Sequence, residues 1–532
     1  MSGQPDVSAL VARAAAERPD AVALVAGARR LTWAELEELV ARVATGIGGA
    51  GVVAGQRVLV ALGNRVEFVT AYLGTLRAQA VSVPVNPTST PHELARMIAD
   101  SGARLAIGDS TTLAALREAV AVVDRARDGE PGALDPDLVQ RAVATRVVAL
   151  DEPPADGELG FDELLAVEPR DVPPLQDPEK LAALLYTSGT SGRPRAAMLT
   201  HRALLANVEQ VAAVEPPMMR ADDIVLGVLP LFHVYGLNAV LGGVARHGCT
   251  LVLTERFEPE ATLDLITAES CTVVPVAPPV FAHWRSVSNL RERLASVRLV
   301  LSGSAPLAAS AIEEFGAATG IELHQGYGLT EAAPVVTSTL CSRTPHHGSV
   351  GAALPGIELR LVDDRGHPPE GEDPGEIQVC GANLFSGYWP DGDEAPGVDG
   401  WWSTGDVGFL DPSGDLFLVD RVKELVIVSG FNVYPIEVED VIREVDGVEE
   451  VAVIGAEDEQ TGEAVVAYVR APGAEPAAVE AAVRARCEER LAGFKRPSRV
   501  EVVDELPLTV TGKVQKGRLR GLERRRALGI LE

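Results

Sequence analysis

The sequence predicts an α/β protein with a large N-terminal domain that ends in a small β unit, followed by a small α+β C-terminal domain. Strand-like apolar runs alternate with helical patterns through residues 6–110 and again through 180–340. That rhythm is typical of βαβ units around a parallel sheet. Short strands with glycine turns fill residues 350–420 and predict a β-barrel-like unit. A compact helix and strand pattern follows Arg421.

The first α/β region is predicted to begin with a helix after Thr32, where Glu35 completes a capping-box pattern. Strands are predicted at 57–62 and 80–85, on either side of a helix at 66–79. Residues 124–158 are polar and contain proline and glycine, so we expect a surface excursion there.

The second α/β region is predicted to contain strands at 181–185, 224–229, 250–253, 273–276 and 297–301, with a helix at 200–214. In the C-terminal domain the pattern predicts helices at 436–444 and 476–491 and strands at 449–455, 463–470 and 498–503. With 532 residues, the chain is too long for a single core.

Composition narrows the function classes. The net charge of −29 argues against binding to nucleic acid or to an anionic membrane. There is no run of eighteen apolar residues and no signal-peptide pattern at the N-terminus. The five cysteines form no C-x-x-C pair, which favours a reducing compartment over a disulfide framework or structural zinc. We therefore expect a cytoplasmic protein without a transmembrane segment.

Residues 186–195, Tyr-Thr-Ser-Gly-Thr-Ser-Gly-Arg-Pro-Arg, are the most informative stretch of the chain. They combine backbone N–H groups, hydroxyls and positive charge, which is the chemistry that holds a polyphosphate. The stretch is not a Walker A loop, because no Gly-Lys-Ser/Thr follows at the required spacing. Alone, it could also be a flexible surface loop.

Four further segments support a nucleotide site. Residues 303–307 are Gly-Ser-Ala-Pro-Leu, and small residues there let a flat ring approach the backbone. Residues 325–331, Gln-Gly-Tyr-Gly-Leu-Thr-Glu, place an aromatic ring, a hydroxyl and a carboxylate together. Residues 402–406, Trp-Ser-Thr-Gly-Asp, present a carboxylate suited to ribose hydroxyls, and residues 507–513, Pro-Leu-Thr-Val-Thr-Gly-Lys, end in a lysine.

In this order the five segments resemble the acyl-adenylate-forming superfamily, which contains acyl-CoA synthetases, luciferases and peptide-synthetase adenylation domains. The resemblance covers about residues 6–520 and is greatest to fatty acyl-CoA synthetases and acid–CoA ligases. It implies two half-reactions. A carboxylate first attacks the α-phosphate of ATP, giving acyl-AMP and pyrophosphate, and a thiol, usually that of CoA, then attacks the acyl carbon and releases AMP.

The resemblance also implies roles for single residues. The β- and γ-phosphates would be held by Thr187, Ser188, Gly189, Thr190, Ser191 and Gly192. The nucleotide site would further contain Gly303, Ser304, Ala305, Pro306, Gln325, Gly326, Tyr327, Gly328, Asp406 and Arg421. The catalytic residues would be Thr330 at the α-phosphate, Glu331 as the Mg²⁺ ligand, and Lys513 between α-phosphate and carboxylate. Taken singly, Glu331 could instead cap a helix, Asp406 could form an Asx-turn, and Lys513 could be a solvated turn residue.

Domain motion is a further implication. Residues 1–420 would form the adenylation domain, 421–425 a hinge with Lys423 at the pivot, and 426–532 a mobile C-terminal domain. Rotation would exchange Lys513 for a face around Gly430 and Phe431 that helps to form the thiol tunnel. Lys495 also matches a family position, either structural or in contact with CoA.

Residues at two positions limit which class of carboxylic acid is expected as the substrate. Peptide-synthetase domains have an aspartate where this chain has His233, so an amino acid is not expected. Malonate-type enzymes have an arginine at the position of Gly326, so a diacid is not expected either. We predict an acyl pocket that includes His233, Val276 and Ala333, suited to an apolar tail.

A medium- or long-chain fatty acid is favoured, with an aryl acid of the coumarate or benzoate type as the alternative. A fatty-acyl-AMP ligase that passes its acyl group to a carrier protein is a further alternative, although no insertion typical of such ligases is evident between residues 331 and 420. A kinase-like NTPase is disfavoured by the missing Walker A motif, and a non-catalytic acyl-binding protein by the presence of Glu331, Asp406 and Lys513.

The phosphate-loop segment departs from its family at one place. The family loop commonly ends in Lys-Pro-Lys-Gly, whereas residues 193–196 are Arg-Pro-Arg-Ala. Arginine can still bind phosphate, but the role of Arg195 and the loop geometry at Ala196 are open. A homodimer and acetylation of Lys513 by a lysine acetyltransferase, which would remove its charge, are further hypotheses.

Overall fold

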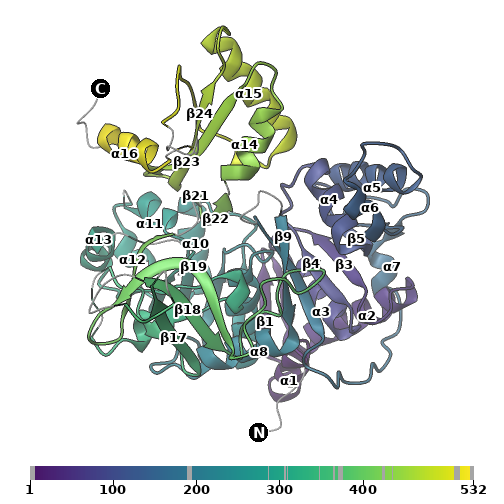
Figure 1. Cartoon of the computed structure of the whole chain (residues 1–532). Coiled ribbons are helices and arrows are strands. Elements are labelled where there is room, and N and C mark those ends of the chain that lie inside the picture. The colour runs from purple at the N-terminus through teal and green to yellow at the C-terminus, as the bar shows by residue number, and fades with distance from the viewer. Residues whose placement is uncertain are drawn as a thin grey trace.

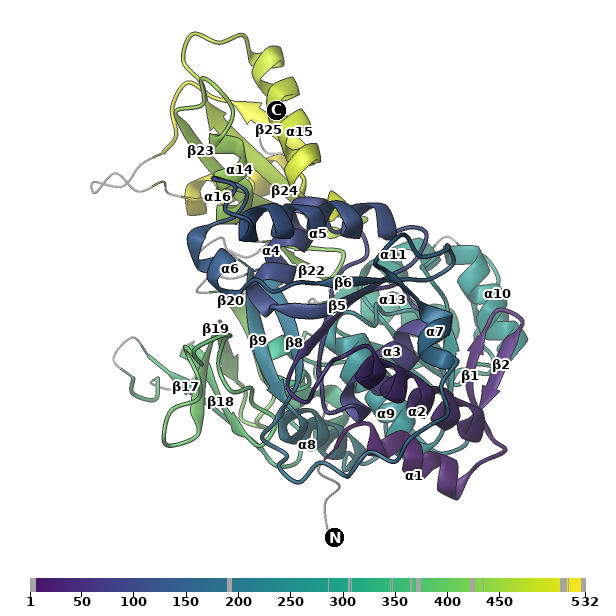
Figure 2. The same ribbon diagram turned by 90° about the vertical axis from the view of Figure 1, so that its right-hand side faces the viewer.

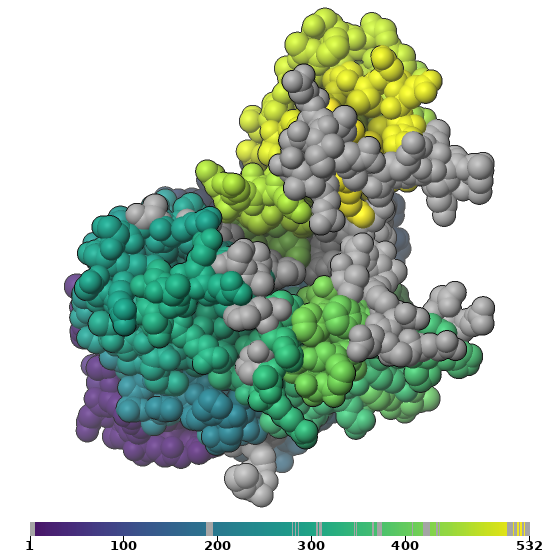
Figure 3. All heavy atoms as spheres, turned by 90° about the vertical axis from the view of Figure 1, so that its left-hand side faces the viewer, coloured from purple at the N-terminus to yellow at the C-terminus, as the bar shows by residue number. Residues whose placement is uncertain are grey.

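The computed structural model describes residues 6–188, 194–285, 287–304, 307, 309–344, 346, 348–363, 366–369, 375–421, 426–433, 435–507, 514 and 516–527. The chain folds into a large N-terminal domain and a small C-terminal domain, which lies at the top in Figures 1 and 2. The space-filling view shows that domain standing out from the body of the protein (Figure 3). Among the described residues, every helix is too short or too polar to cross a bilayer.

Two seven-stranded sheets form the frame of the N-terminal domain. The first has the order β7 (Leu159–Gly160), β6 (Arg146–Ala149), β5 (Ala103–Gly108), β3 (Arg57–Ala61), β4 (Val81–Pro84), β8 (Leu181–Ser188) and β9 (Pro194–Thr200). The second has the order β14 (Leu323–Gln325), β13 (Leu299–Ser302), β12 (Val273–Val276), β10 (Ile224–Gly227), β11 (Thr250–Leu253), β1 (Val22–Ala26) and β2 (Arg29–Thr32). All neighbouring pairs are parallel except β8–β9 and β1–β2, as expected for βαβ units.

Helices cover both faces of each sheet. The inner layer contains α2 (Trp33–Gly49), α3 (Val66–Arg77), α8 (His201–Ala212), the π-helix η1 (Tyr235–Gly242) and α9 (Gly243–His247). The outer face of the first sheet packs on α4 (Pro91–Ser101), α5 (Leu113–Arg127) and α6 (Pro136–Arg141), and that of the second on α10 (Pro259–Glu269), α11 (Pro279–Trp284), α12 (Leu290–Arg293) and α13 (Ala309–Thr319). Helices α1 (Ala9–Glu17) and α7 (Phe161–Leu165) complete the domain.

Strand alternation explains these layers. Val58 and Val60 of β3 face the inner core, whereas Leu59 and Ala61 of the same strand face the outer helices. Because successive side chains of a strand point to opposite faces, a continuous apolar run lets a strand be buried on both sides.

The small β unit is a four-stranded antiparallel sheet of β17 (Ile357–Val362), β18 (Gly375–Gly381), β19 (Trp401–Leu410) and β20 (Leu416–Arg421). Short elements link it to the second sheet: η2 (Thr330–Ala332), β15 (Thr337–Ser338), η3 (Thr339–Cys341) and β16 (Ala352–Ala353). The C-terminal domain contains β21 (Val426–Val428), β22 (Phe431–Val433), β23 (Glu450–Asp458), β24 (Gly462–Arg470) and β25 (Arg499–Val502), with α14 (Pro435–Arg443), α15 (Pro476–Arg490), η4 (Gly493–Lys495) and α16 (Lys516–Ala527).

Most predicted elements are confirmed, including the capping box, in which the Glu35 N–H donates to Thr32 Oγ1 over 3.2 Å and the Thr32 N–H donates to Glu35 Oε2 over 2.8 Å. The surface excursion at 124–158 was wrong in part, because it contains β6, a strand inside the first sheet with Val148 fully buried. A strand was also missed: β9 lies between the phosphate-loop segment and helix α8. That segment is therefore the connection of a β8–β9 hairpin.

Candidate active site

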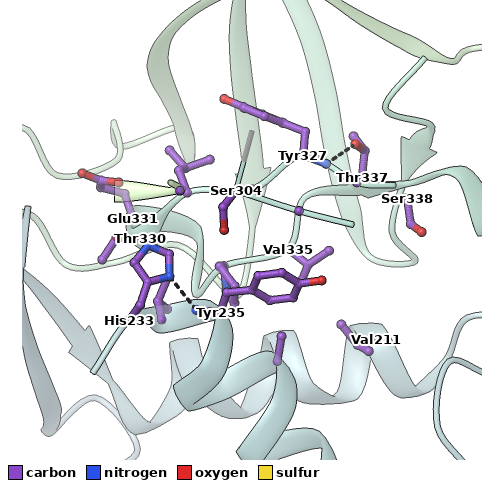
Figure 4. Close-up of a pocket in the computed structure, with 18 of the residues that line it drawn as sticks. Val211, His233, Tyr235, Ser304, Tyr327, Thr330, Glu331, Val335, Thr337 and Ser338 are labelled. Carbon is purple, nitrogen blue, oxygen red and sulfur yellow. Dashed lines mark hydrogen bonds between the residues drawn. The ribbon is translucent and has the colours of Figure 1, made fainter. Parts of the chain in front are cut away.

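A cavity of about 170 Å³ lies where the carboxyl ends of β13 and β14 meet the small β unit and the C-terminal domain. In proteins with open α/β sheets, ligands commonly bind outside the carboxyl ends of the strands. The cavity brings together most of the predicted residues that the structure describes (Figure 4): Thr187, His233, Gly303, Ser304, Gln325, Gly326, Tyr327, Gly328, Thr330, Glu331, Asp406 and Gly430.

Tyr327 and Asp406 form a hydrogen-bonded pair across this cavity. The Tyr327 hydroxyl donates to Asp406 Oδ2 over 2.6 Å, and both residues are buried. Asp406 lies on β19 opposite Arg421 of β20. The Tyr327 N–H in turn donates to Thr337 Oγ1 over 3.2 Å. Two residues predicted for the nucleoside from separate motifs are thus fixed relative to each other.

Glu331 is held by a tyrosine that the sequence did not indicate. The Tyr388 hydroxyl donates to Glu331 Oε1 over 2.6 Å. The guanidinium of Arg195 lies 3.6 Å above the centre of the Tyr388 ring and pairs with Glu394 over 2.8 Å. Arg195 therefore supports Tyr388 and also brings positive charge to the cavity wall.

Ala196 fits its place as a strand residue. It is fully buried in β9, and its carbonyl accepts the Trp389 N–H over 2.9 Å. Its φ is not positive, so the position does not need a glycine. The substitution of the family's glycine is therefore compatible with regular β8–β9 pairing.

His233 and Tyr235 lie where η1 begins, and π-helical turns are frequent at functional sites. His233 Nδ1 accepts the Tyr235 N–H over 3.3 Å, and burial lowers the pKa of His233 to about 4. The imidazole is therefore neutral near pH 7. The Tyr235 ring lies against Gly303, where a Cβ would be 2.8 Å from Tyr235 Cε1. Sequence reasoning missed Tyr235, although it lies two residues after His233.

Of the three residues predicted for the acyl pocket, only His233 lines this cavity. Val276 packs on the outer helices of the second sheet, while its neighbour Pro275 lines the cavity. Ala333 lies in the inner core, and its carbonyl accepts Asn238 Nδ2 over 2.7 Å, whereas Pro334 reaches the cavity. For Val276 the reason is strand alternation, since a shift of one residue along a strand reverses the face. The apolar lining includes Val211, Met218, Met219, Ala239, Val240, Leu301 and Val335.

Gln325 and Gly326 support the shape of the cavity. The Gln325 side chain donates from Nε2 to the Ser349 carbonyl over 2.6 Å. A Cβ on Gly326 would lie 2.4 Å from the Thr337 carbonyl oxygen, which is too close for any other residue. The glycine thus allows two backbone segments to meet at the cavity wall.

The C-terminal domain contributes Gly430 and Phe431. Gly430 has a φ of +83° and lies against Ser304, whose Cβ would be 3.4 Å from a Cβ at Gly430. The Phe431 ring stacks on Phe232 with centres 6.1 Å apart. Phe431 also lines a second cavity of about 670 Å³ between the two domains. His233 and Thr330 line both cavities, so they lie where the two spaces meet.

Several predicted residues lie outside what the structure describes. They are Gly189, Thr190, Ser191, Gly192, Ala305, Pro306, Lys423 and Lys513, together with the side chains of Ser188 and Arg421. Their roles remain predictions.

Comparison with known families decides the class of this chain. The model described as AMP-binding enzyme matches residues 11–389, and that of the AMP-binding enzyme C-terminal domain matches residues 437–513. The chain belongs to the AMP-binding enzyme family. The match confirms the resemblance found in the sequence, on both sides of the segment predicted as the hinge.

Relatives of known activity agree with this family. 4-Coumarate–CoA ligase 3 of Oryza sativa subsp. japonica is 34% identical over 94% of this chain and 88% of its own length. A long-chain-fatty-acid–CoA ligase of Bacillus subtilis is 31% identical over 96% of this chain and 94% of its own length. A solved structure of Bacillus subtilis o-succinylbenzoate CoA synthetase, a double mutant bound to its product analogue, is 27% identical and superimposes with a TM-score of 0.80, covering 96% of this chain and 98% of its own. Together they confirm the expected enzyme class, an AMP-forming acid–CoA ligase that uses ATP and CoA.

Proposed function

We propose that this acid–CoA ligase activates a compact apolar acid, with an aryl acid preferred to a long-chain fatty acid. The observation that supports this choice is that the Tyr235 ring packs against Gly303. The ring, labelled in Figure 4, gives the cavity a flat wall. The buried side chains of Met218 and Met219 also line the cavity and add to its apolar surface. A site with a flat aromatic wall suits a ring better than a long flexible chain.

A fatty acid remains the second candidate, because a long-chain-fatty-acid–CoA ligase is among the relatives with the highest coverage of this chain. Its tail would have to displace the buried methionines or leave the cavity elsewhere. The neutral His233 lies between the two cavities. It would separate the acyl side from the thiol side without placing a charge beside an apolar substrate.

For adenylation, the Tyr327–Asp406 pair would hold the nucleoside, with the ring against the base and the carboxylate at the ribose hydroxyls. Thr330 would contact the α-phosphate, and Lys513 would draw charge from phosphate and carboxylate together as the bond forms. Arg195 would add positive charge on the phosphate side. The roles of Tyr327 and Asp406 draw support from their mutual hydrogen bond.

Mg²⁺ would be held by Glu331. The described residues contain no cluster of three or more His, Cys, Asp or Glu side chains. A single carboxylate nevertheless fits Mg²⁺, which usually takes one or two carboxylates and completes its coordination with substrate phosphates and water. The ion would screen the phosphate charge against the incoming carboxylate, and Tyr388 would fix the orientation of Glu331.

For thiol transfer, the second cavity would admit the thiol arm toward Thr330 and His233. Phe431 lines this second cavity, and its neighbour Gly430 lines the first. The present orientation of the C-terminal domain would therefore serve the second half-reaction. The superposition on a CoA synthetase bound to a product analogue supports this assignment. Rotation about residues 421–425 would bring Lys513 in for the first half-reaction.

An acid panel tests the substrate. Benzoate, cinnamate, 4-coumarate and straight-chain acids from six to sixteen carbons would each be assayed for acyl-CoA formation with ATP and CoA. We expect the highest kcat/KM for an aryl or aryl-propenoic acid. A maximum at twelve to sixteen carbons would instead support the fatty acid alternative.

Replacing Tyr235 by alanine is expected to change the choice of acid. Loss of the ring removes the flat wall, so kcat/KM for the best acid should fall roughly tenfold or more, with a smaller loss for bulkier acids. The panel above provides the measurement. Tyr235→Phe keeps the ring and serves as the control, with an unchanged order of preference. The same order of preference in Tyr235→Ala would contradict the assigned wall.

A further inference from the structure

Three charged side chains meet at the boundary of the two domains and form a cluster that we term the interdomain triad: Lys495, Glu437 and Glu93. Lys495 Nζ lies 2.8 Å from Glu437 Oε1 and 3.1 Å from Glu93 Oε1. Lys495 of η4 and Glu437 of α14 belong to the C-terminal domain, whereas Glu93 of α4 belongs to the N-terminal domain. Only 9–12% of each side chain is exposed.

Because the triad is buried, the free energy of its contacts depends on whether each charge keeps its partners. An exposed ion pair contributes little, but a buried charge that loses a partner leaves a costly uncompensated group. Glu437 stays with Lys495 in any orientation of the domains, because both belong to the C-terminal one. The contact between Lys495 and Glu93 exists only in an orientation like the present one.

Glu93 is held in position by a second set of contacts. Its Oε2 accepts the Thr90 N–H over 2.8 Å and the Thr90 hydroxyl over 3.1 Å, in the capping box of α4. The other oxygen, Oε1, is thereby directed at Lys495. The carboxylate is fixed within its own domain before the C-terminal domain meets it.

Neighbouring contacts show that the domains meet along the start of α4. His92 Nε2 lies 3.3 Å from a guanidinium nitrogen of Arg490. On the C-terminal side, Phe494 precedes Lys495 and packs on Phe431 with ring centres 4.7 Å apart, and Phe431 stacks on Phe232 next to His233. These residues surround the second cavity. The triad therefore lies on the same boundary as the path that we assign to the thiol.

We propose that Glu93 and Lys495 are positioning residues that hold the C-terminal domain in the orientation for thiol transfer. This proposal rests on the two half-reactions of the proposed function. The pair must separate when Lys513 is brought in for adenylation, and it re-forms for transfer. Its loss would lower the population of the transfer orientation, and with it the rate of the second half-reaction alone.

Glu93→Gln is the most specific test, because a glutamine can keep the capping box while it removes the charge that faces Lys495. We expect acyl-CoA formation from supplied acyl-AMP to fall roughly tenfold. The rate of acid-dependent ATP–pyrophosphate exchange should remain within about twofold of the wild-type rate. Glu35→Gln is the matched control, since Glu35 completes the same kind of capping box on α2 but is exposed. It should alter neither half-reaction.

A second measurement requires no activity. Hydrogen–deuterium exchange should become faster at the start of α4 and at η4 in Glu93→Gln, and stay unchanged at both places in Glu35→Gln. The proposal would be overturned if Glu93→Gln changed neither the hydrogen–deuterium exchange at these two places nor the rate of thiol transfer. An equal loss of both half-reactions would also overturn it. If the unchanged enzyme showed no pyrophosphate exchange with any acid, the proposed function would fail instead, and the deuterium measurement would still decide whether the triad holds the domains.

Discussion

Replacing Lys513 by alanine is expected to abolish acid-dependent ATP–pyrophosphate exchange while leaving acyl-CoA formation from supplied acyl-AMP largely intact. The transition state of adenylation spreads negative charge over the α-phosphate and the carboxylate, and removing a cation aimed at it should cost roughly 10²–10³-fold in rate. The transfer step needs no such cation, because the acyl-phosphate bond is already formed.

Measuring the two half-reactions separately on the same preparation tests this prediction. Lys180→Ala removes a positive charge from an exposed position before β8 and should leave both rates unchanged. An equal loss of both half-reactions in Lys513→Ala would contradict a C-terminal domain that presents different faces in the two steps.

The second large effect is expected for Glu331→Gln. The substitution keeps the shape and a hydrogen-bond acceptor for Tyr388 but removes the charge that would hold Mg²⁺. Adenylation should fall roughly 10²-fold at saturating ATP, and the Mg²⁺ concentration for half-maximal exchange should rise. Tyr388→Phe removes one hydrogen bond to the Glu331 carboxylate and should lower the rate of adenylation roughly tenfold.

Titration of pyrophosphate exchange with Mg²⁺ in the three proteins provides the measurement. If Glu331→Gln keeps the Mg²⁺ dependence of the unchanged enzyme, the metal is held elsewhere and the role of Tyr388 is lost with it. Transfer from supplied acyl-AMP should be nearly unaffected in both variants, since no pyrophosphate is then displaced from ATP.

Local patterns predicted much of the fold. The strands and helices of both α/β regions leave periodic apolar runs, and the Thr32–Glu35 box marks a helix start at the correct residue. What such patterns do not contain is pairing at long range. Strand β1 lies beside β11, with Leu24 opposite Leu251, so the start of the chain completes the second sheet. Strand β6 was missed because its short apolar core lies within a polar stretch.

The candidate site was predictable where residues occur in motifs. Tyr327, Glu331 and Asp406 stand in short segments of unusual composition, and the structure brings them to one cavity. Tyr388 belongs to no such segment, and only its hydroxyl contact with Glu331 reveals it. Val276 lies on the face of its strand away from this cavity, whereas Pro275 lines it. The sequence did not indicate which of two successive strand residues faces the cavity. Lys495 and Glu93 lie 402 positions apart, so their contact had no local signal.

Acid-dependent ATP–pyrophosphate exchange, followed by addition of CoA, is the most direct test of the two-step activity proposed for this enzyme. An acid–CoA ligase of this kind should catalyse exchange with an apolar aryl acid in the absence of CoA, and should form stoichiometric AMP and acyl-CoA once CoA is added. The absence of exchange across the whole acid panel, or the formation of ADP and phosphate in place of AMP and pyrophosphate, would contradict this proposed activity.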